Sequence, residues 1–167
     1  DSPTCDISGQ FMVLSFAASK KRLVKSLDIT NAYFQGEEQD RLMLLKQPST
    51  GLPGEDPDQY FIARVPIYGT VDAGRKFWKK LKTELTKFGL RENSVMPALY
   101  SMKDEHGKII LMVATHVDDI IWVDTPETEW IMKTLSETFQ CGDPETHDFR
   151  YCGKEIVQNN DYSINVT

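Results

Sequence analysis

Two adjacent aspartates between two apolar stretches constrain this chain more than any other feature. Asp118 and Asp119 lie between residues 108–115 and residues 120–123, so the sequence predicts two strands joined by a tight turn that holds both acids. Neighbouring carboxylates repel each other, which raises their pKa values unless a cation neutralises them. Aspartate also favours turns through hydrogen bonds to its own backbone, so a plain turn and a cation site both remain open here.

A third carboxylate, Asp28, ends another predicted strand, residues 23–29. If the two strands share a sheet, Asp28 meets the adjacent pair. Three such carboxylates would hold two magnesium ions about 3.5–4 Å apart, an arrangement that activates an attacking oxygen and stabilises a leaving one. Magnesium prefers oxygen ligands, which aspartate supplies. The pattern therefore predicts phosphoryl or nucleotidyl transfer.

The rest of the chain alternates between helical and extended patterns. Helices are predicted at 10–19 and 73–88, and a third follows Thr125. The predicted strands are 23–29, 41–46, 60–65, 99–102, 108–115, 120–123 and a terminal hairpin of 149–157 with 162–166. Three prolines and two glycines predict a loop within 47–59.

The ends of two helices carry specific signals. Asp72 stands where an N-cap would accept backbone hydrogen bonds before 73–88, and Gly89 stands where a residue of positive φ would end that helix. Thr125 is predicted to cap the third helix, with Pro126 in its first position. The apolar residues that line the two helices are Phe77, Leu81, Leu85 and Phe88 in the first, and Trp130, Ile131, Leu135 and Phe139 in the second.

The order of elements predicts an α+β fold, in which an antiparallel sheet of the split βαβ type has its helices packed on one face. No repeat or domain boundary interrupts the chain, so 1–167 is predicted to be one domain. The composition, 26% charged and 40% hydrophobic, is typical of a soluble globular domain. No apolar run is long enough for a membrane span, so no membrane association is expected. No signal peptide is visible at the first residues, and an excised domain is expected.

Charge and cysteine content exclude other classes. The net charge of −6 argues against a general nucleic-acid coat protein, although lysines and arginines gather at 20–25 and 75–87. Both basic groups are equally consistent with solvated faces. Cys5, Cys141 and Cys152 are odd in number and lack CxxC spacing, which argues against a disulfide framework or a structural metal. An intracellular, reducing compartment is expected.

Five segments in order match one family. LDITNAYFQG at 27–36 resembles the first catalytic motif of reverse transcriptases, in the form found in copia-type retrotransposons. YGTVDAGRKFWKKL at 68–81, FGL at 88–90 with PALY at 97–100, HVDDII at 116–121 and YCGKEI at 151–156 resemble the family's later motifs. The resemblance covers about residues 11–157 and implies an RNA-directed DNA polymerase, centred on the palm with part of the fingers.

The resemblance implies roles for the residues of the first and fourth motifs. Asp28, Asp118 and Asp119 would be the catalytic, metal-binding carboxylates, and the Ile29 carbonyl would be a further ligand of two Mg²⁺ ions, for which Mn²⁺ can substitute. Tyr33 would be the steric gate that favours a deoxynucleotide triphosphate over a ribonucleotide. Without the motif, a core aromatic residue is the alternative interpretation of Tyr33.

The remaining motifs would contact the nucleotide, primer and template. The resemblance implies nucleotide contacts for Asp72 and Arg75, and nucleic-acid contacts for Lys76, Lys79, Lys80, His116, Tyr151 and Gly153. Three positions depart from the family pattern: Asp72 stands in place of glutamine, His116 in place of tyrosine or phenylalanine, and Gly74 in place of proline. A histidine at the turn is more often a partly exposed turn residue than a metal ligand.

The expected partners are an RNA or DNA template with its primer, a dNTP, and the remaining regions of a polyprotein, since thumb and ribonuclease H regions are absent from these residues. The expected location is a cytoplasmic virus-like particle or the nucleus. Two alternatives are open. The chain is an inactive, co-opted copy that serves as a structural or interaction module with protein partners, or it is another palm-type nucleotidyltransferase.

Overall fold

The structure, a computed structural model, describes residues 2–167. Its elements, in chain order, are α1 (Ile7–Lys20), β1 (Lys25–Asp28), the 3₁₀ helix η1 (Ala32–Gln35), β2 (Leu44–Lys46), β3 (Tyr60–Ile62), α2 (Ala73–Lys87), β4 (Arg91–Glu92), β5 (Leu99–Lys103), β6 (Ile109–His116), β7 (Asp119–Val123), α3 (Glu129–Thr138), β8 (Glu145–Thr146), β9 (Asp148–Tyr151), β10 (Lys154–Gln158) and β11 (Ile164–Val166). The predicted mixture of helices and antiparallel strands is confirmed.

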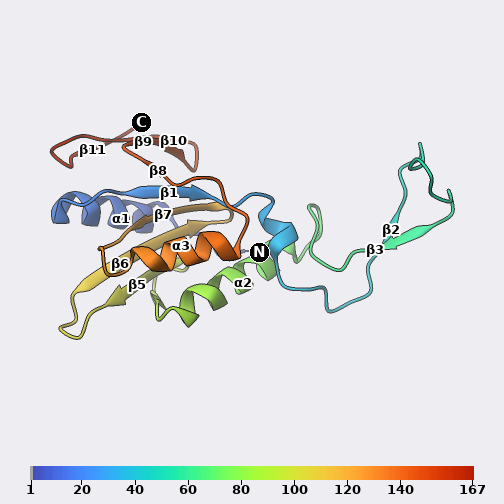
Figure 1. Ribbon diagram of the computed structural model, residues 1–167, viewed down its shortest axis with the longest axis horizontal. Coiled ribbons are helices and arrows are strands. Elements are labelled where there is room, and N and C mark those ends of the chain that lie inside the picture. Colours follow the sequence, from blue (N-terminus) through green and yellow to red (C-terminus); the bar gives the residue numbers. More distant parts are fainter. Residues whose placement is uncertain (1) are drawn as a thin grey trace.

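The main sheet has six strands in the order β4-β5-β6-β7-β1-β8. Each neighbouring pair is antiparallel, so β1 and β6 run parallel on either side of β7. Because α2 lies between β1 and β6 in the chain, these elements form a split βαβ unit. Strands β9 to β11 form a second sheet beside the β8 edge, and the β2–β3 ribbon projects away from the main sheet (Figure 1).

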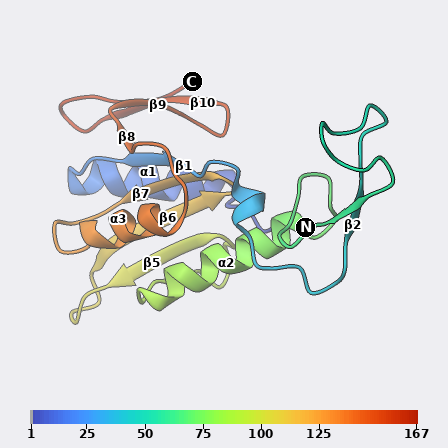
Figure 2. The same ribbon diagram turned by 45° about the vertical axis from the view of Figure 1, so that its right-hand side comes forward.

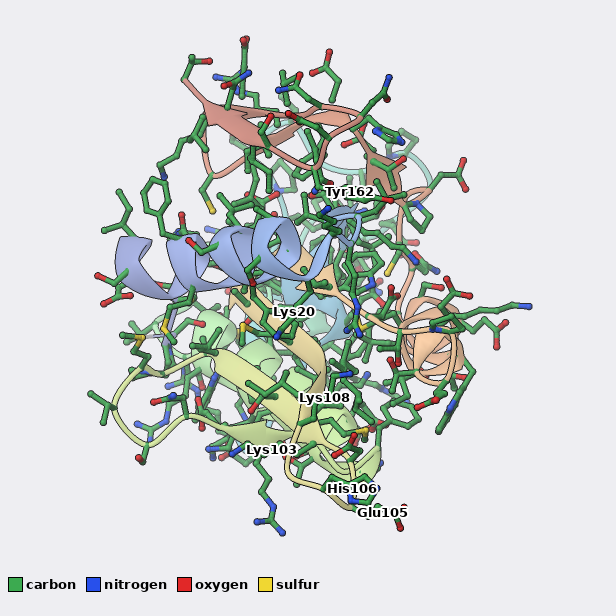
Figure 3. All side chains as sticks on the ribbon, turned by 90° about the vertical axis from the view of Figure 1, so that its left-hand side faces the viewer. Lys20, Lys103, Glu105, His106, Lys108 and Tyr162 are labelled. Carbon is green, nitrogen blue, oxygen red and sulfur yellow. The ribbon has the colours of Figure 1, made fainter. Side chains whose placement is uncertain are left out.

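The helices do not share one face of the main sheet, so that part of the prediction is wrong. Helix α1 packs on β6 and β7, and a Cβ placed on Gly9 would lie 3.9 Å from the Cβ of Leu99. The next residue, Tyr100, points to the other face, where its hydroxyl lies near Trp78 of α2. Figure 3 shows α1 and α3 on opposite sides of the sheet. Apolar residues on both sides of α1 leave its orientation undetermined in the sequence.

Helices α2 and α3 share the second face. The ring of Phe77 meets that of Phe139, which follows α3, in an edge-on contact with centroids 6.0 Å apart. Phe77, Leu81 and Leu85 are all buried, as their spacing predicts. Trp130, predicted to line the core, is instead 55% exposed and packs edge-on against Phe88. Phe88 is the C-cap of α2, and Figure 2 shows this helix running on the same side of the main sheet as α3.

The helix ends differ from the predictions in two places. Gly89 has φ +91°, as predicted, but Asp72 makes no capping hydrogen bond with its side chain. Thr125 does not cap α3: Thr128 is the N-cap, and residues 125–128 form a turn in which the Thr128 N–H donates to the Thr125 carbonyl at 2.9 Å. Pro126 therefore lies in this turn and outside the helix.

The other boundaries shift for local reasons. Helix α1 begins at Ile7, earlier than predicted, because the Asp6 carboxylate accepts the Gly9 N–H at 2.7 Å. The predicted terminal hairpin is three strands, since Cys152 and Gly153 form an additional tight turn between β9 and β10. Cys5, Cys141 and Cys152 carry free thiols, as predicted. None of the helices in residues 2–167 has both the length and the apolar run required to cross a membrane.

Candidate active site

The predicted carboxylates meet at one end of the main sheet. Asp28, the last residue of β1, lies directly opposite Asp119, the first residue of β7. The Ile29 N–H donates to the Asp118 carbonyl at 2.9 Å, which fixes the β6–β7 turn beside the end of β1. Val117 in this turn has φ +57°. Residues facing each other on neighbouring strands project to the same side of a sheet, so Asp28 and Asp119 share a face.

The electrostatics of this end of the sheet are those of an uncompensated acidic cluster. Burial and the nearby charge of Asp118 raise the pKa of Asp28. Burial also raises the pKa of Asp119, as do the charges of Asp118 and Asp28, while a hydrogen bond from the Cys152 N–H lowers it. None of the ion pairs among residues 2–167 includes any of the three carboxylates.

The donor set fits divalent cations. Carboxylate and carbonyl oxygens are the ligands that Mg²⁺ and Mn²⁺ prefer, and a bound cation would relieve the repulsion that raises the two pKa values. Across residues 2–167, no group of three or more His, Cys, Asp or Glu side chains is close enough to hold a metal ion. Binding of one cation by all three carboxylates therefore requires side-chain positions other than those described here.

Aromatic rings form a wall beside the carboxylates. Tyr33, in η1, packs against Tyr68 with ring centroids 4.7 Å apart and the ring planes tilted by 41°, and Phe34 meets Tyr68 edge-on at 5.5 Å. Burial raises the pKa of Tyr68, and the charges of Asp118, Tyr33 and Asp28 raise it further. Tyr68 nevertheless remains 52% exposed. The wall therefore borders the carboxylates on a side open to solvent.

Two thiols lie next to the acids, and sequence reasoning assigns neither a role. Cys141 pairs with Ile29 in an isolated antiparallel bridge, and burial together with the charge of Asp28 raises its pKa to about 11. Cys152 donates its backbone N–H to Oδ2 of Asp119 at 3.3 Å. Both contacts join segments that are far apart in the chain, so no local sequence pattern predicts them. Sequence reasoning also missed Tyr68, which could have been found because it is the first residue of the motif at 68–81.

Comparison with known proteins identifies the family. The sequence model described as "Reverse transcriptase (RNA-dependent DNA polymerase)" matches residues 1–166. The chain belongs to this family. It is 27% identical over 146 residues to the "Retrovirus-related Pol polyprotein from transposon RE2" and 25% identical over 146 residues to that of transposon RE1, both from Arabidopsis thaliana. Each match covers 86% of this chain and 10% of the relative.

These matches confirm the copia-type resemblance drawn from the motifs. The chain spans 10% of the length of either Pol polyprotein. The family assignment therefore concerns residues 1–166, the part of the chain that the family model matches.

The residues predicted to contact the nucleotide lie around the start of α2. Tyr33 is half-buried, with its hydroxyl 3.6 Å from the position that a Cβ on Gly74 would occupy. The Asp72 carboxylate lies 3.4 Å from Nη2 of Arg41, which offsets its negative charge. Arg75 is exposed on the next turn. In this reverse transcriptase domain, the three predicted nucleotide contacts thus gather at one helix end.

The three lysines predicted to contact nucleic acid differ in their surroundings. The Lys76 ammonium donates to the Glu38 carbonyl at 3.0 Å and lies 3.3 Å from the Asp40 carboxylate, so its positive charge is offset within the protein. Lys79 is exposed. Lys80 lies over the Phe139 ring, 5.6 Å from its centroid. Lys79 and Lys80 therefore remain better placed than Lys76 for contact with phosphate.

The other predicted nucleic-acid contacts lie around the carboxylates. His116 faces Asp119 across the β6–β7 pair, and its Nδ1 is buried without a partner among the described residues. Tyr151 is only 1% exposed, so its side chain supports the β9–β10 turn from inside and does not reach the surface. Gly153 is exposed in that turn with φ +78°. Only the turn itself can meet a nucleic acid there.

The first basic group of the sequence lies at the opposite end of the molecule. Figure 3 looks at the end away from the β2–β3 ribbon and shows Lys20 near the viewer, with Tyr162 above it. Strand β1 begins close by, at Lys25, and runs away from this end to Asp28. The lysines and arginine of 20–25 therefore do not surround the carboxylates.

Proposed function

We propose that this reverse transcriptase domain carries out templated nucleotidyl transfer, in which the 3′-oxygen of a primer attacks the α-phosphate of a dNTP. The observation that carries the proposal is the pairing of Asp28 with Asp119, with Asp118 in the adjoining turn. An acidic cluster of this kind, which has no ion-pair partner among residues 2–167, is costly unless a cation occupies it.

The residues around the cluster have separate tasks in this proposal. Two Mg²⁺ ions, or Mn²⁺ in their place, would be held by Asp28, Asp118, Asp119 and the Ile29 carbonyl, and would activate the attacking oxygen and stabilise the leaving one. Tyr33 would exclude a ribose 2′-hydroxyl by occupying the space beside the sugar. Its contact with the Tyr68 ring supports this role, because a ring held by a neighbour resists displacement by the substrate.

The proposal includes the macromolecular partners. An RNA or DNA template with its primer would run past the β9–β10 turn and α2, with Lys79 and Lys80 near backbone phosphates. Arg75 would face the incoming nucleotide. The remaining regions of a Pol polyprotein would complete the enzyme, and the proposed location is a cytoplasmic virus-like particle or the nucleus.

The first test measures cation binding. The unmodified chain and its Asp28→Asn and Asp118→Asn variants are titrated with Mn²⁺ in the presence of dTTP, and free Mn²⁺ is followed by electron paramagnetic resonance. Asp148→Asn is the matched control, because Asp148 is an exposed carboxylate of β9 outside the site. We expect the unmodified chain and the control to bind Mn²⁺ and the other two variants to lose binding. Equal binding by all four proteins would contradict the proposed site.

One observation favours a second candidate, an inactive copy that serves as an interaction module. The β2–β3 ribbon exposes apolar side chains, among them Leu44 (55% exposed) and Ile62 (59%), which face each other across the strands, and Leu42, just before β2, is 72% exposed. A two-stranded ribbon rarely holds such a face uncovered. Absence of Mn²⁺ binding, together with a protein partner that buries this ribbon, would favour this candidate over the polymerase.

A further inference from the structure

The tight turn between β9 and β10 contacts the acidic cluster directly. Tyr151 pairs with Lys154, and the two residues between them, Cys152 and Gly153, both have positive φ, at +47° and +78°. This is the geometry of a two-residue hairpin turn whose twist matches that of the strands. A cysteine is an uncommon residue at positive φ. The turn therefore keeps this conformation against a local steric cost.

The conformation directs one backbone donor at a catalytic residue. The Cys152 N–H lies at the head of the turn and donates to Oδ2 of Asp119 at 3.3 Å, across 33 positions of sequence. Burial and the neighbouring charges raise the pKa of Asp119, and its contacts with Cys152, the backbone N–H foremost, are what lower it. The hydrogen bond leaves the second oxygen of Asp119 available for a cation.

A chain of hydrogen bonds fixes the turn in place. The Lys154 ammonium donates to Oε1 of Gln10 in α1 at 3.3 Å, and Nε2 of Gln10 donates to the Cys5 carbonyl at 3.1 Å. The Cys5 N–H in turn donates to the Thr115 carbonyl at 2.9 Å, near the end of β6. The turn is thus tied, through α1, to the same strand pair that carries Asp119.

We propose that the backbone N–H of Cys152 is a positioning group for Asp119: it holds one oxygen of this carboxylate at the turn and leaves the other free to bind a divalent cation. The inference rests on the proposed function of Asp119 as a metal ligand. It assigns the turn a second task beside any contact with the primer. Movement of the turn changes the orientation of a catalytic carboxylate, so primer contact and cation binding are coupled.

The decisive experiment removes only the N–H. In one version of the chain, Cys152 is replaced by lactic acid, which converts the amide to an ester and deletes the donor. In the matched control, Cys152→Ala, the methyl side chain is the same and the N–H is kept. A second control places glycolic acid at position 153, which tests for general weakening of the turn. Mn²⁺ affinity is measured for all of them and for the unmodified chain, with circular dichroism to verify folding.

We expect the ester at 152 to weaken Mn²⁺ binding by roughly tenfold, the lower end of what loss of a partner to a metal ligand produces. Cys152→Ala and the ester at 153 should bind like the unmodified chain. If the ester at 152 binds equally well, the positioning role is refuted while the polymerase proposal stands. If Cys152→Ala is as weak as the ester, the thiol acts and the backbone does not, which also refutes it. If the unmodified chain fails to bind Mn²⁺, both proposals fall.

A second measurement needs no variant and decides the question if the ester does not fold. The chain has three cysteines, so selective ¹⁵N-cysteine labelling gives three amide signals. On titration with Mg²⁺, the Cys152 amide signal should shift because its acceptor becomes a metal ligand. The Cys5 amide, which bonds to a backbone carbonyl, should not. A Cys152 signal that stays unchanged at saturating Mg²⁺ would overturn the proposal.

Discussion

Replacing Asp119 by asparagine should stabilise the metal-free protein. Asp119 faces Asp28 directly across the β1–β7 pair and lies beside Asp118, and no internal cation offsets the three charges among the described residues. Asparagine has nearly the same shape, and its Oδ1 can still accept the Cys152 N–H. The substitution therefore removes charge and keeps the hydrogen bond.

The size of the effect follows from the geometry. A pair of like charges directly opposite on neighbouring strands costs between about 0.2 and 1 kcal/mol. Asp119 experiences this repulsion from Asp28, further repulsion from Asp118, and the cost of partial burial, so about 1 kcal/mol in total is expected. For a chain of 167 residues, a gain of about 1 kcal/mol raises Tm by roughly 2–4 °C.

The gain should depend on pH in a defined direction. Because the pKa of Asp119 is raised in the folded state, the folded protein holds this proton more tightly than the unfolded chain does. The destabilisation is therefore present above the folded-state pKa and is lost as the pH falls through it towards the ordinary value near 4. Asp119→Asn should exceed the unmodified protein in Tm at pH 7, and the difference should close below about pH 4.

The assay is thermal unfolding followed by circular dichroism, without divalent cations and then with Mg²⁺. Mg²⁺ should raise the Tm of the unmodified protein and leave that of Asp119→Asn nearly unchanged, since a ligand stabilises only the form that binds it. Asp148→Asn, in an exposed position, should have the same Tm as the unmodified protein, both without divalent cations and with Mg²⁺. If Asp119→Asn has the same or a lower Tm at pH 7 without divalent cations, the reasoning about repulsion at this sheet end is refuted.

Three further predictions concern the core, a buried ion pair and the thiols. Phe77→Ala should lower the free energy of unfolding by about 3–5 kcal/mol, since the ring is fully buried, whereas Val71→Ala, at a 94% exposed position, should change it little; urea unfolding measures both, and equal values would contradict the packing. Lys25→Met should lower the free energy of unfolding by about 2 kcal/mol, because the buried Asp124 carboxylate, which lies 3.0 Å from the ammonium, loses this counterion. Burial lowers the pKa of Lys25, but the hydrogen bonds and charges of Asp124 and Glu129 together raise it by more, so the stability from this pair is fully present below the ordinary value of 10.5 and should be lost as the pH rises above it. A Tm difference between the unmodified protein and Lys25→Met that does not shrink above pH 10.5 would contradict this. Burial raises the pKa of Cys5 to about 12 and those of the other two cysteines to about 11, so a thiol reagent at pH 8 should modify the native protein far more slowly than the urea-unfolded chain.

The parts of the fold that sequence reasoning reaches are those with a strong local pattern. Helix α2, predicted at 73–88, is observed at Ala73–Lys87, because four apolar residues at helical spacing and Gly89 define both its buried face and its end. The carboxylates are predicted to meet because each ends or begins an apolar strand. The register that places Asp28 opposite Asp119 follows from the burial of Leu27 and Ile120, which face each other one position further in.

The parts that sequence reasoning misses depend on contacts between distant segments. Nothing local shows that α1 covers the face opposite α2 and α3, since Phe11 and Met12 remain exposed on a helix that is apolar on both sides. The turn at 125–128 holds Thr125 out of its predicted N-cap position by bonding it to Thr128. The burial of Tyr151 likewise depends on how the second sheet packs. A motif match gives the position of such a residue in a family and does not give its exposure.

Several of the lysines on α2 are neutralised by carboxylates within the protein. The sequence presents a continuous basic face, yet Lys82 lies 2.6 Å from the Glu92 carboxylate and Lys87 lies 2.7 Å from that of Glu84. Lys76 is likewise paired with the loop before β2. Among the described residues of this face, Lys79 and Lys80 enter no ion pair with a carboxylate. Under the proposed function, a phosphate backbone that follows α2 would therefore meet only a short positive segment in a chain of net charge −6. Its binding there would depend on these two side chains, and the salt dependence would be shallow because few phosphates are neutralised.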